Sequence, residues 1–350
     1  MNEKITIYDI AKRLKITAAT VSRALNNNPK ISEATRLLVL KTAKEMNYKQ
    51  NKVALALKSG KSNNVGVIVP YINRNFFSSI IRGIEEELYP KGYHVIICQT
   101  HEEEQKEIKT IDNLLNAQVD GVLMSVSKQT TTSEHFERVL EKHIPLVFFD
   151  RRAQLKGVSS VTIDDYQGGF DATKHLIDQG CSRIAHICGD LKLEIYRDRF
   201  EGYKAALKQA GIAYNEDYVI QTKSDTESGH FAAQELLKLD KLPDAVFSSS
   251  DHTALGVIQK FKEHGIKIPK DICVVGFSNE PFTKFMELTI SSVDQCTMEM
   301  GRVAARVFLE QVKNPKIKIE KKVELTPQLL VRESSVKVND TTKKLRVSKG

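Results

Sequence analysis

Apolar residues recur every three or four positions in two short segments near the N-terminus of this 350-residue chain. They are Ile7, Ile10, Ala11 and Leu14 in the first segment and Val21, Ala24 and Leu25 in the second. Thr6 stands at an N-cap position with Asp9 three residues later, and after a break at 15–16 Thr17 can cap the second segment. The pattern predicts two amphipathic helices that pack on each other across a tight turn.

The second segment leaves a polar face uncovered, which consists of Ala18, Ala19, Ser22, Arg23 and Asn26. Two packed helices with such a face form a helix-turn-helix, whose second helix enters the DNA major groove. A third helix is expected at 33–46, with Ala34, Leu37, Leu38 and Ala43 closing a small core. Residues 51–58 then read as a cap and one or two helical turns, followed by a polar linker at 59–64. A helix this short is marginal alone, so we expect it to form only when docked.

From Val65 onward, short apolar runs alternate with longer amphipathic segments. The expected strands are 65–70, 94–99, 121–125, 146–150, 161–163, 184–188, 218–221, 245–248 and 272–277. The expected helices are about 76–91, 103–116, 133–142, 169–179, 199–210, 229–239 and 253–264. Continuous apolar strands that alternate with helices predict parallel sheets covered on both faces. Two such blocks predict an α/β core of two doubly wound lobes, with a ligand site at the cleft between them.

Positive charge is concentrated at the N-terminal end of the chain. The net charge is +8, yet residues 1–62 hold thirteen Lys/Arg and four Asp/Glu, so the remaining 288 residues are slightly acidic. A basic surface could simply be solvated, but here it coincides with the helix-turn-helix pattern. The charge therefore favours binding to DNA phosphates, with an affinity that falls steeply with salt.

Several other classes of protein are excluded by what the sequence lacks. No apolar run approaches the roughly 18 residues of a membrane span, and no hydrophobic signal region begins the chain. The five cysteines are scattered without C-x-x-C spacing, so we expect buried thiols rather than disulfides or metal ligands. No G-x-S-x-G motif, P-loop or histidine cluster suggests an enzyme, a metal site or a cofactor. These features fit a cytoplasmic protein that binds no membrane.

Motifs along nearly the whole chain resemble the LacI/GalR family of bacterial transcription regulators. Thr-Ile-Tyr-Asp-Ile-Ala occupies 6–11, Ala-Thr-Val-Ser-Arg-Ala-Leu-Asn 19–26, Val-Gly-Val-Ile-Val-Pro 65–70, Arg-Phe-Glu-Gly-Tyr 199–203 and Ile-Cys-Val-Val-Gly-Phe 272–277. Further matches lie at 30–36, 47–48, 51–57, 75–77, 120–123 and 251–256. The resemblance implies an all-α helix-turn-helix headpiece joined to a periplasmic-binding-protein-like core whose lobes are linked by several crossovers.

The resemblance also divides the chain into domains. The headpiece spans 1–50, a hinge helix and linker 51–63, and the effector-binding core 64–335. Within the core, the first lobe takes about 64–160 and 291–322, and the second about 161–290 and 323–335. Residues 336–350 are polar and basic and are expected to form a disordered tail. Because the tail has no leucine heptads, a homodimer is expected rather than a tetramer.

By the same resemblance, the DNA contacts are Thr6, Tyr8, Thr17, Ala18, Ala19, Ser22, Arg23, Asn26, Asn51, Ala54 and Leu57. Arg23 can pair with a guanine edge, although a phosphate contact alone remains the alternative. Relatives often carry polar residues at the positions of Ala18 and Ala19, so the operator sequence stays open. Leu57 resembles the hinge leucine that wedges into the minor groove; the alternative is ordinary hinge packing.

The implied effector pocket contains Phe76, Phe77, Asp150, Arg199, Asp251 and Ser278. Asp150 ends an expected strand and Arg199 opens an expected helix, and this pair suits a polyhydroxylated ligand. The two phenylalanines could equally be core residues, and Asp251 could equally be a helix cap. Ser278 departs from the family, in which an acidic residue is common at that position.

These features together predict a repressor that binds palindromic double-stranded operator DNA as a homodimer and responds to a small-molecule effector, a sugar or sugar derivative. The alternative is a regulator of the catabolite-control type, governed by a phosphorylated carrier protein. A sugar-binding protein of the transport type would share the core but would need a secretion signal, and it would not use residues 6–26.

Overall fold

The computed structural model describes residues 5–49, 61–314 and 319–337. The chain divides into two compact units, Met1–Ser62 and Asn63–Gly350. The expected hinge helix at 51–58 lies outside the described residues, and so does the tail from residue 338 onward. Val336 and Lys337, which we assigned to a disordered tail, are described, and the backbone N–H of Lys337 donates to the side chain of Gln179 at 3.1 Å.

The first unit is a three-helix bundle built from α1 (Ile7–Leu14), α2 (Ala18–Leu25) and α3 (Glu33–Glu45). The carboxylate of Asp9 accepts hydrogen bonds from the backbone N–H and the hydroxyl of Thr6, at 2.8 and 2.7 Å. The hydroxyl of Thr17 accepts from the backbone N–H of Thr20 at 3.1 Å. Both caps that the sequence predicts therefore start their helices, because each satisfies N–H groups that the first turn leaves without partners.

The buried face of α3 differs from the one we expected. Leu37 and Leu38 are 59% and 51% exposed, and Ala34 is also exposed. Ala43 is buried as expected, and Val39, four residues earlier on the same face, packs with it against α1 and α2 in place of the two leucines. Because α3 carries apolar residues on more than one face, its sequence does not determine which face is buried. The contacts with α1 and α2 determine which face turns inward.

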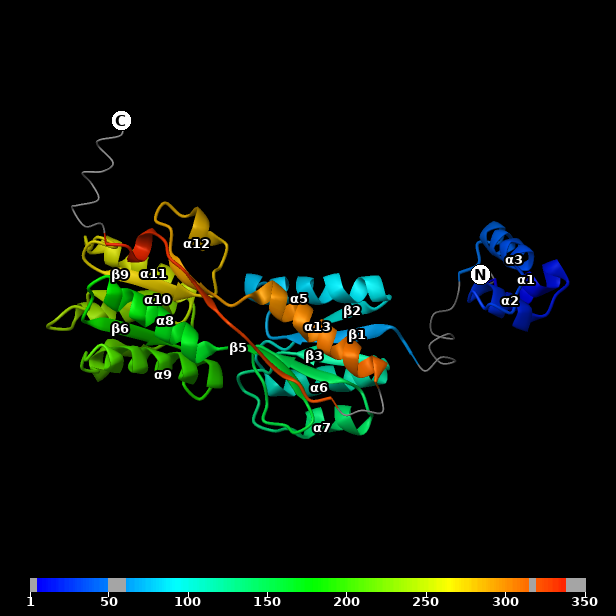
Figure 1. Cartoon of the computed structure of the whole chain (residues 1–350), viewed down its shortest axis with the longest axis horizontal. Coiled ribbons are helices and arrows are strands. Elements are labelled where there is room, and N and C mark those ends of the chain that lie inside the picture. The colour runs from blue at the N-terminus through cyan, green and yellow to red at the C-terminus, as the bar shows by residue number, and fades with distance from the viewer. Residues whose placement is uncertain (1–4, 50–60, 315–318, 338–350) are drawn as a thin grey trace, which may run out of the picture. The chain divides into compact units, whose positions relative to one another are not determined.

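The first lobe of the second unit contains a fully parallel six-stranded sheet in the order β11-β5-β4-β3-β1-β2. Helices α5 and α13 pack on one face, and α6 and α7 on the other (Figure 1). The bounds are β1 Asn64–Val69, α5 Asn75–Leu88, β2 His94–Gln99, α6 Glu104–Asn116, β3 Gly121–Met124, α7 Glu134–Glu141, β4 Leu146–Phe149, β5 Ser159–Ile163, α13 Thr297–Lys313 and β11 Lys322–Leu325, with a 3-10 turn at Tyr89–Lys91.

The second lobe contains a six-stranded sheet in the order β12-β10-β9-β8-β6-β7, in which only β12 is antiparallel to its neighbour. Helices α8 and α9 pair with each other, as do α10 and α11. The bounds are α8 Asp165–Asp178, β6 Ile184–Cys188, α9 Glu194–Gln209, β7 Val219–Gln221, α10 Thr226–Leu237, β8 Ala245–Ser248, α11 Asp251–Glu263, β9 Cys273–Phe277, α12 Phe282–Phe285, β10 Ser291–Asp294 and β12 Gln328–Leu330, with 3-10 turns at Glu216–Tyr218 and Glu333–Ser335.

The fold class is confirmed, but the expected lobe boundaries are wrong at three strands. β5 pairs with β4 in the first sheet, β10 pairs with β9 in the second, and β11 belongs to the first sheet rather than the second. The chain therefore crosses between lobes after Ile163, after Asp294 and between Leu325 and Gln328. An apolar run shows that a strand exists, but only backbone pairing decides which sheet it joins.

These crossovers bring the carboxyl ends of both sheets toward one cleft. Asp150 directly follows β4, Ser249 follows β8, Ser278 follows β9 and Gln295 follows β10. Strands β3 and β4 are buried along their whole length, as expected for a sheet covered on both faces. Among the described residues, no helix is long and apolar enough to cross a membrane.

Candidate functional sites

The exposed face of α2 carries the residues expected to contact DNA. Ala19, Arg23 and Asn26 are exposed, Ser22 is half-buried, and Tyr8 on α1 is 71% exposed. Thr6 and Thr17, the two N-caps, are also exposed. The prediction that Ala18 faces outward is wrong, because this residue is half-buried and packs against the bundle core. Asn51, Ala54 and Leu57 lie outside the described residues.

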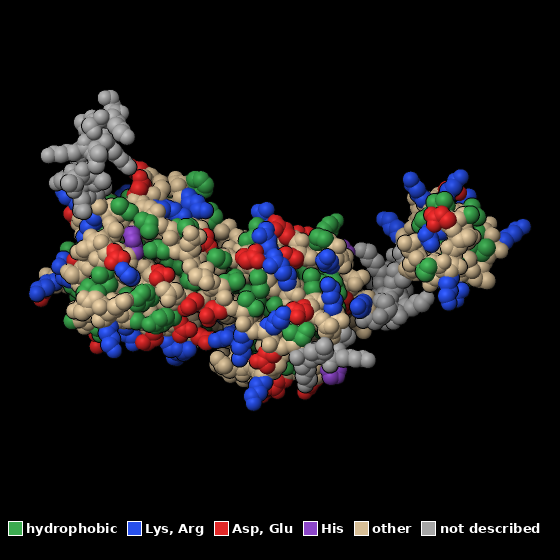
Figure 2. Space-filling model, in the orientation of Figure 1, with side chains coloured by type: hydrophobic (Ala, Val, Ile, Leu, Met, Phe, Trp, Pro, Cys, Tyr) green, Lys and Arg blue, Asp and Glu red, His purple; other side chains and the backbone are tan. Residues whose placement is uncertain are grey.

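Basic side chains project widely from this helical unit (Figure 2). Residues 5–49 contain nine Lys/Arg and three Asp/Glu. Ion pairs join Arg13 to Glu45 at 3.0 Å and Arg36 to Glu33 at 2.8 Å. Arg23 forms no ion pair within 4 Å among the residues that the structure describes, so its guanidinium is available to a base edge or a phosphate. The unit thus presents a helix face together with excess positive charge.

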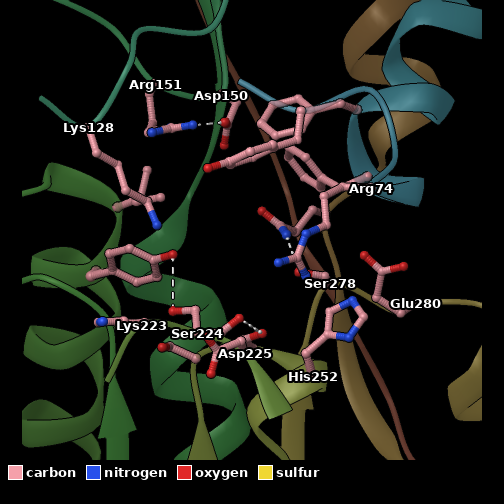
Figure 3. A pocket seen from close by; sticks show the side chains of 18 of the residues that line it. Arg74, Lys128, Asp150, Arg151, Lys223, Ser224, Asp225, His252, Ser278 and Glu280 are labelled. Atoms are coloured by element: carbon pink, nitrogen blue, oxygen red, sulfur yellow. Dashed lines mark hydrogen bonds and ion pairs between the residues drawn. The ribbon is translucent and has the colours of Figure 1, made fainter. Parts of the chain in front are cut away.

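The second unit contains a cavity of about 350 Å³ between its lobes (Figure 3). First-lobe residues that line it include Arg74, Phe76, Phe77, Lys128 and Asp150, and second-lobe residues include Tyr196, Arg199, Asp225, Ser278 and Glu280. Five of the six residues expected in an effector pocket lie here: Phe76, Phe77, Asp150, Arg199 and Ser278. Phe77 is also buried in the hydrophobic core, so its two suggested roles coincide.

Asp150 turns its carboxylate into the cleft from the end of β4. Its backbone is in the left-handed region at φ 61°, a conformation that Asp adopts more readily than most residues. Oδ2 accepts hydrogen bonds from Ser125 Oγ at 2.9 Å and from Arg151 Nε at 3.5 Å. Burial raises the pKa of Asp150, and the charge of Arg151 opposes that shift. Within the described chain, only Oδ2 of this carboxylate accepts hydrogen bonds.

Arg199 reaches the cavity from α9 with its guanidinium fixed on three sides. Nε donates to Asp165 at 2.7 Å, Nη1 to the carbonyl of Ser249 at 3.0 Å and Nη2 to Gln295 at 3.1 Å. The guanidinium also lies 3.7 Å from the ring centroid of Phe277. Among the residues that the structure describes, two of its five N–H groups have no acceptor and remain for a ligand. The helix begins at Glu194 rather than at Arg199, so Arg199 projects from its second turn.

Asp251 does not line the cavity, although we expected a possible ligand contact. It is fully buried at the start of α11, where its carboxylate accepts from Ser292 Oγ at 2.7 Å and from the backbone N–H of Glu280 at 2.8 Å. Burial raises its pKa to about 7, against the effect of those two hydrogen bonds. The suggested cap is not formed either, because Ser250 is the N-cap of α11 and Asp251 is its first residue. The buried carboxylate has a different structural role, which is to bind β10 and the segment that follows β9.

Glu280 supplies an acidic group near the position where Ser278 departs from the family. It is 6% exposed, it lines the cavity, and burial raises its pKa while the charge of Arg74 lowers it. Ser278 Oγ accepts from Gln295 Nε2 at 2.8 Å. In Figure 3, Arg74, Glu280 and His252 gather at one end of the pocket. The acidic group that we judged to be lost is therefore provided two residues later.

Most of the charged residues in the cavity were not predicted from the sequence. They are Arg74, Glu102, Lys128, Arg151, Lys223, Asp225, His252 and Glu280. A usable signal existed for some of them: Lys128 and Lys223 stand a few residues after β3 and β7, at the carboxyl ends of strands. Arg151 is bidentate on Glu102, with N–O distances of 2.9 and 3.2 Å.

Nothing in the described ranges suggests a metal centre. No group of three or more His, Cys, Asp or Glu side chains among these residues could hold a metal ion. All five cysteines are free thiols, three of them buried. The cavity instead offers hydrogen-bond donors, hydrogen-bond acceptors and aromatic rings. Such a combination is typical of a binding site for a small polar molecule.

A two-lobed, small-molecule-binding core that carries a helix-turn-helix unit defines a class of ligand-responsive DNA-binding regulators. The comparisons agree: residues 6–51 match the family described as bacterial regulatory proteins, lacI family, and residues 173–335 match the periplasmic binding protein-like domain. The chain belongs to the LacI family of transcriptional regulators. Members combine a DNA-binding domain with an effector-binding domain, and they are regulators rather than enzymes.

Individual relatives align over almost the full chain. Catabolite control protein A of Priestia megaterium is 34% identical over 305 residues, which cover 87% of this chain and 91% of that protein. The HTH-type transcriptional repressor PurR of Vibrio campbellii is 31% identical over 337 residues, which cover 95% of this chain and 99% of that protein. A solved CelR–cellobiose complex superposes with a TM-score of 0.72 at 29% identity, covering 94% of this chain and 99% of that one.

Proposed function

We propose that this protein is a repressor whose affinity for operator DNA is set by a sugar or sugar derivative bound between the lobes of its core. One observation carries the proposal. Asp150 on the first lobe and Arg199 on the second face the same cavity, and both retain unused hydrogen-bonding capacity. A ligand that bonds to both side chains stabilises one arrangement of the lobes over others.

The DNA-binding part of the proposal is a homodimer on a palindromic site. One helix-turn-helix reads a half-site, and two-fold symmetry supplies the second. Ala19, Ser22, Arg23 and Asn26 would face the major groove, with Arg23 as the strongest candidate for base reading. Leu57, outside the described residues, remains proposed as the minor-groove wedge on the family resemblance alone. The protein would act in the cytoplasm, where its DNA is.

The ligand can regulate DNA binding only if it binds the operator-competent and operator-incompetent states unequally. The coupling must be reciprocal, so operator DNA changes the affinity for the ligand by the same factor. Couplings of this kind are ordinarily about 1–3 kcal/mol.

Control by a phosphorylated carrier protein is the second candidate, favoured by the similarity to catabolite control protein A. A small ligand is better supported, because the cavity presents convergent polar groups from both lobes. The cellobiose in the similar CelR structure points to the same class of ligand.

The test is operator binding with and without sugars. Fluorescence anisotropy on genomic fragments should identify an operator, whose complex weakens steeply with salt, and sedimentation should show a dimer. A sugar that shifts wild-type affinity should have no effect on Arg199→Ala, which should bind the operator almost normally without ligand.

Arg197→Ala is the matched control, since Arg197 is exposed on the same helix and does not line the cavity. It should keep the full response. A full response from Arg199→Ala would show that the pocket assignment is wrong, and a response only to a phosphorylated protein would establish the second candidate.

A further inference from the structure

Arg74, Lys128 and Lys223 line the cavity without an ion pair in the described part of the chain, and the ammonium of Lys128 is held beside an aromatic ring. The ammonium of Lys128 lies 5.7 Å from the ring centroid of Tyr196, and in the described part of the chain no carboxylate lies within 4 Å of it. Figure 3 shows its side chain directed into the pocket. A cation held beside an aromatic ring in a cleft gains from any anionic group that the cleft admits.

Glu102 and Asp150, two carboxylates of the first lobe that line the cavity, are already engaged by other residues. Both carboxylate oxygens of Glu102 bond to Arg151, and Oε2 also accepts the backbone N–H of Lys128 at 2.8 Å. Asp150 is balanced by Arg151, and the charge of Arg199 also acts on it. The Arg151–Glu102 and Arg199–Asp165 ion pairs leave those two arginines neutralised, so Lys128 differs from them.

Two side chains in this part of the cavity, Tyr196 and Arg199, can donate hydrogen bonds to a ligand. The hydroxyl oxygen of Tyr196 accepts from Ser224 Oγ at 3.3 Å, so the phenolic hydrogen is free to donate to a ligand. Arg199 lies 5.5 Å from the same ring and keeps two N–H groups. The ammonium of Lys128 and the guanidinium of Arg199 lie near the ring of Tyr196, whose own hydroxyl can also donate. These donors favour a ligand group that only accepts hydrogen bonds, such as a carboxylate or a phosphate.

Asp150 adds a hydrogen-bond acceptor to the same cavity. The hydrogen bonds that Asp150 receives within the described chain all go to Oδ2, which leaves Oδ1 for a ligand hydroxyl. The cavity is therefore complementary to a ligand that carries both an anionic group and at least one hydroxyl.

We propose that the ligand is an acidic sugar derivative, in which a carboxylate or phosphate contacts Lys128 and Tyr196 while a hydroxyl donates to Asp150. This inference rests on the proposed function and narrows its ligand from sugars in general to anionic ones. A neutral sugar would leave the ammonium without a counter-charge when the lobes exclude water.

The experiment is calorimetric titration of the full chain with hexoses and pentoses, each offered as the neutral sugar, the sugar acid and the sugar phosphate. The acid or the phosphate should bind at least about tenfold more tightly than its neutral counterpart. Whichever of the two binds identifies the anionic group. Lys128→Gln should lose this preference, Lys128→Arg should retain it, and higher salt should reduce it.

Lys192→Gln is the matched control, because Lys192 is an exposed lysine that does not line the cavity. Equal or tighter binding of neutral sugars, a preference that survives in Lys128→Gln, or no binding of any acid or phosphate would overturn the inference. A neutral sugar that releases the operator would overturn it while leaving the proposed function intact. If no sugar binds and none alters operator affinity, both the inference and the proposed function are refuted.

Discussion

The buried histidine His186 shows how the interior of the core suppresses protonation of a side chain. His186 on β6 is fully buried and stacks on Phe200, Tyr203 and Phe247, with ring centroids 4.7–5.8 Å away. Its Nδ1 donates to the carbonyl of Phe247 at 3.1 Å, while Nε2 has no partner within the described chain. Burial lowers the pKa of His186 to about 3, so the ring stays neutral at physiological pH.

This residue predicts acid sensitivity. Because the folded pKa is below the unfolded value, the unfolded state takes up the proton first as the pH falls. The stability that His186 contributes is present above about pH 6.5 and is lost progressively toward pH 3. The unfolding temperature of His186→Phe should fall less steeply than that of the wild type between pH 6.5 and 4. The lost hydrogen bond should shift the whole curve by an amount that does not depend on pH. His264→Gln, at an exposed histidine, should follow the wild type, and parallel curves for His186→Phe would refute the assignment.

At the scale of elements, helices α8 and α9 pack without side chains between them at two points. A Cβ on Gly169 would lie 2.2 Å from the carbonyl oxygen of Arg199, and one on Gly202 would lie 2.1 Å from that of Tyr166. This close approach places Asp165, on the first turn of α8, within 2.7 Å of the Arg199 side chain. The geometry of the pocket arginine thus depends on two glycines that touch no ligand.

Gly169→Ala should therefore separate the helices at Arg199. We expect a loss of about 1–3 kcal/mol in the free energy of unfolding, the range for overpacking, together with weaker ligand binding. Denaturant unfolding and calorimetry measure the two effects. Lys174→Ala, at an exposed position of α8, should change neither by much. A stable variant with normal binding would mean that the helices can move apart freely.

At the scale of the whole core, an ion pair joins the two lobes beside the cavity. Arg152, after β4, donates to Glu194, at the start of α9, at 2.8 and 3.1 Å. Both side chains are about one-third exposed, at 29% and 33%. Hydrogen bonding to Arg152 lowers the pKa of Glu194. A pair in this position resists separation of the lobes, although water screens part of its strength.

Arg152→Met and Glu194→Gln should each lower ligand affinity about two- to fivefold, the range for a partly exposed pair. The double variant should lose no more than the larger single effect, because both changes remove the same interaction. Titration of the four proteins with a sugar that binds the wild type gives the coupling. Removing the Arg183–Asp244 pair, which lies within the second lobe, is the control. Additive losses would show that Arg152 and Glu194 act separately.

The sequence by itself determined the local structure and the class of protein. Capping residues such as Thr6 and Thr17, apolar runs such as 184–188 and the charge of residues 1–62 act over a few positions. Their consequences are helices, strands and a basic unit, which a linear pattern can show. Asp150 and Arg199 could be assigned to one pocket only through the family resemblance, because 49 positions separate them in the chain.

Only the tertiary structure decided which strands share a sheet, which face of α3 is buried and which charges meet in the cleft. β5, β10 and β11 look like any other short strand until backbone pairing assigns them. The engagement of Asp251 with Ser292 depends on residues brought together from different elements, and so does the position of Lys128 beside Tyr196 without an ion pair in the described chain. Such contacts are set by the packing of whole lobes, and no periodicity along the chain encodes them.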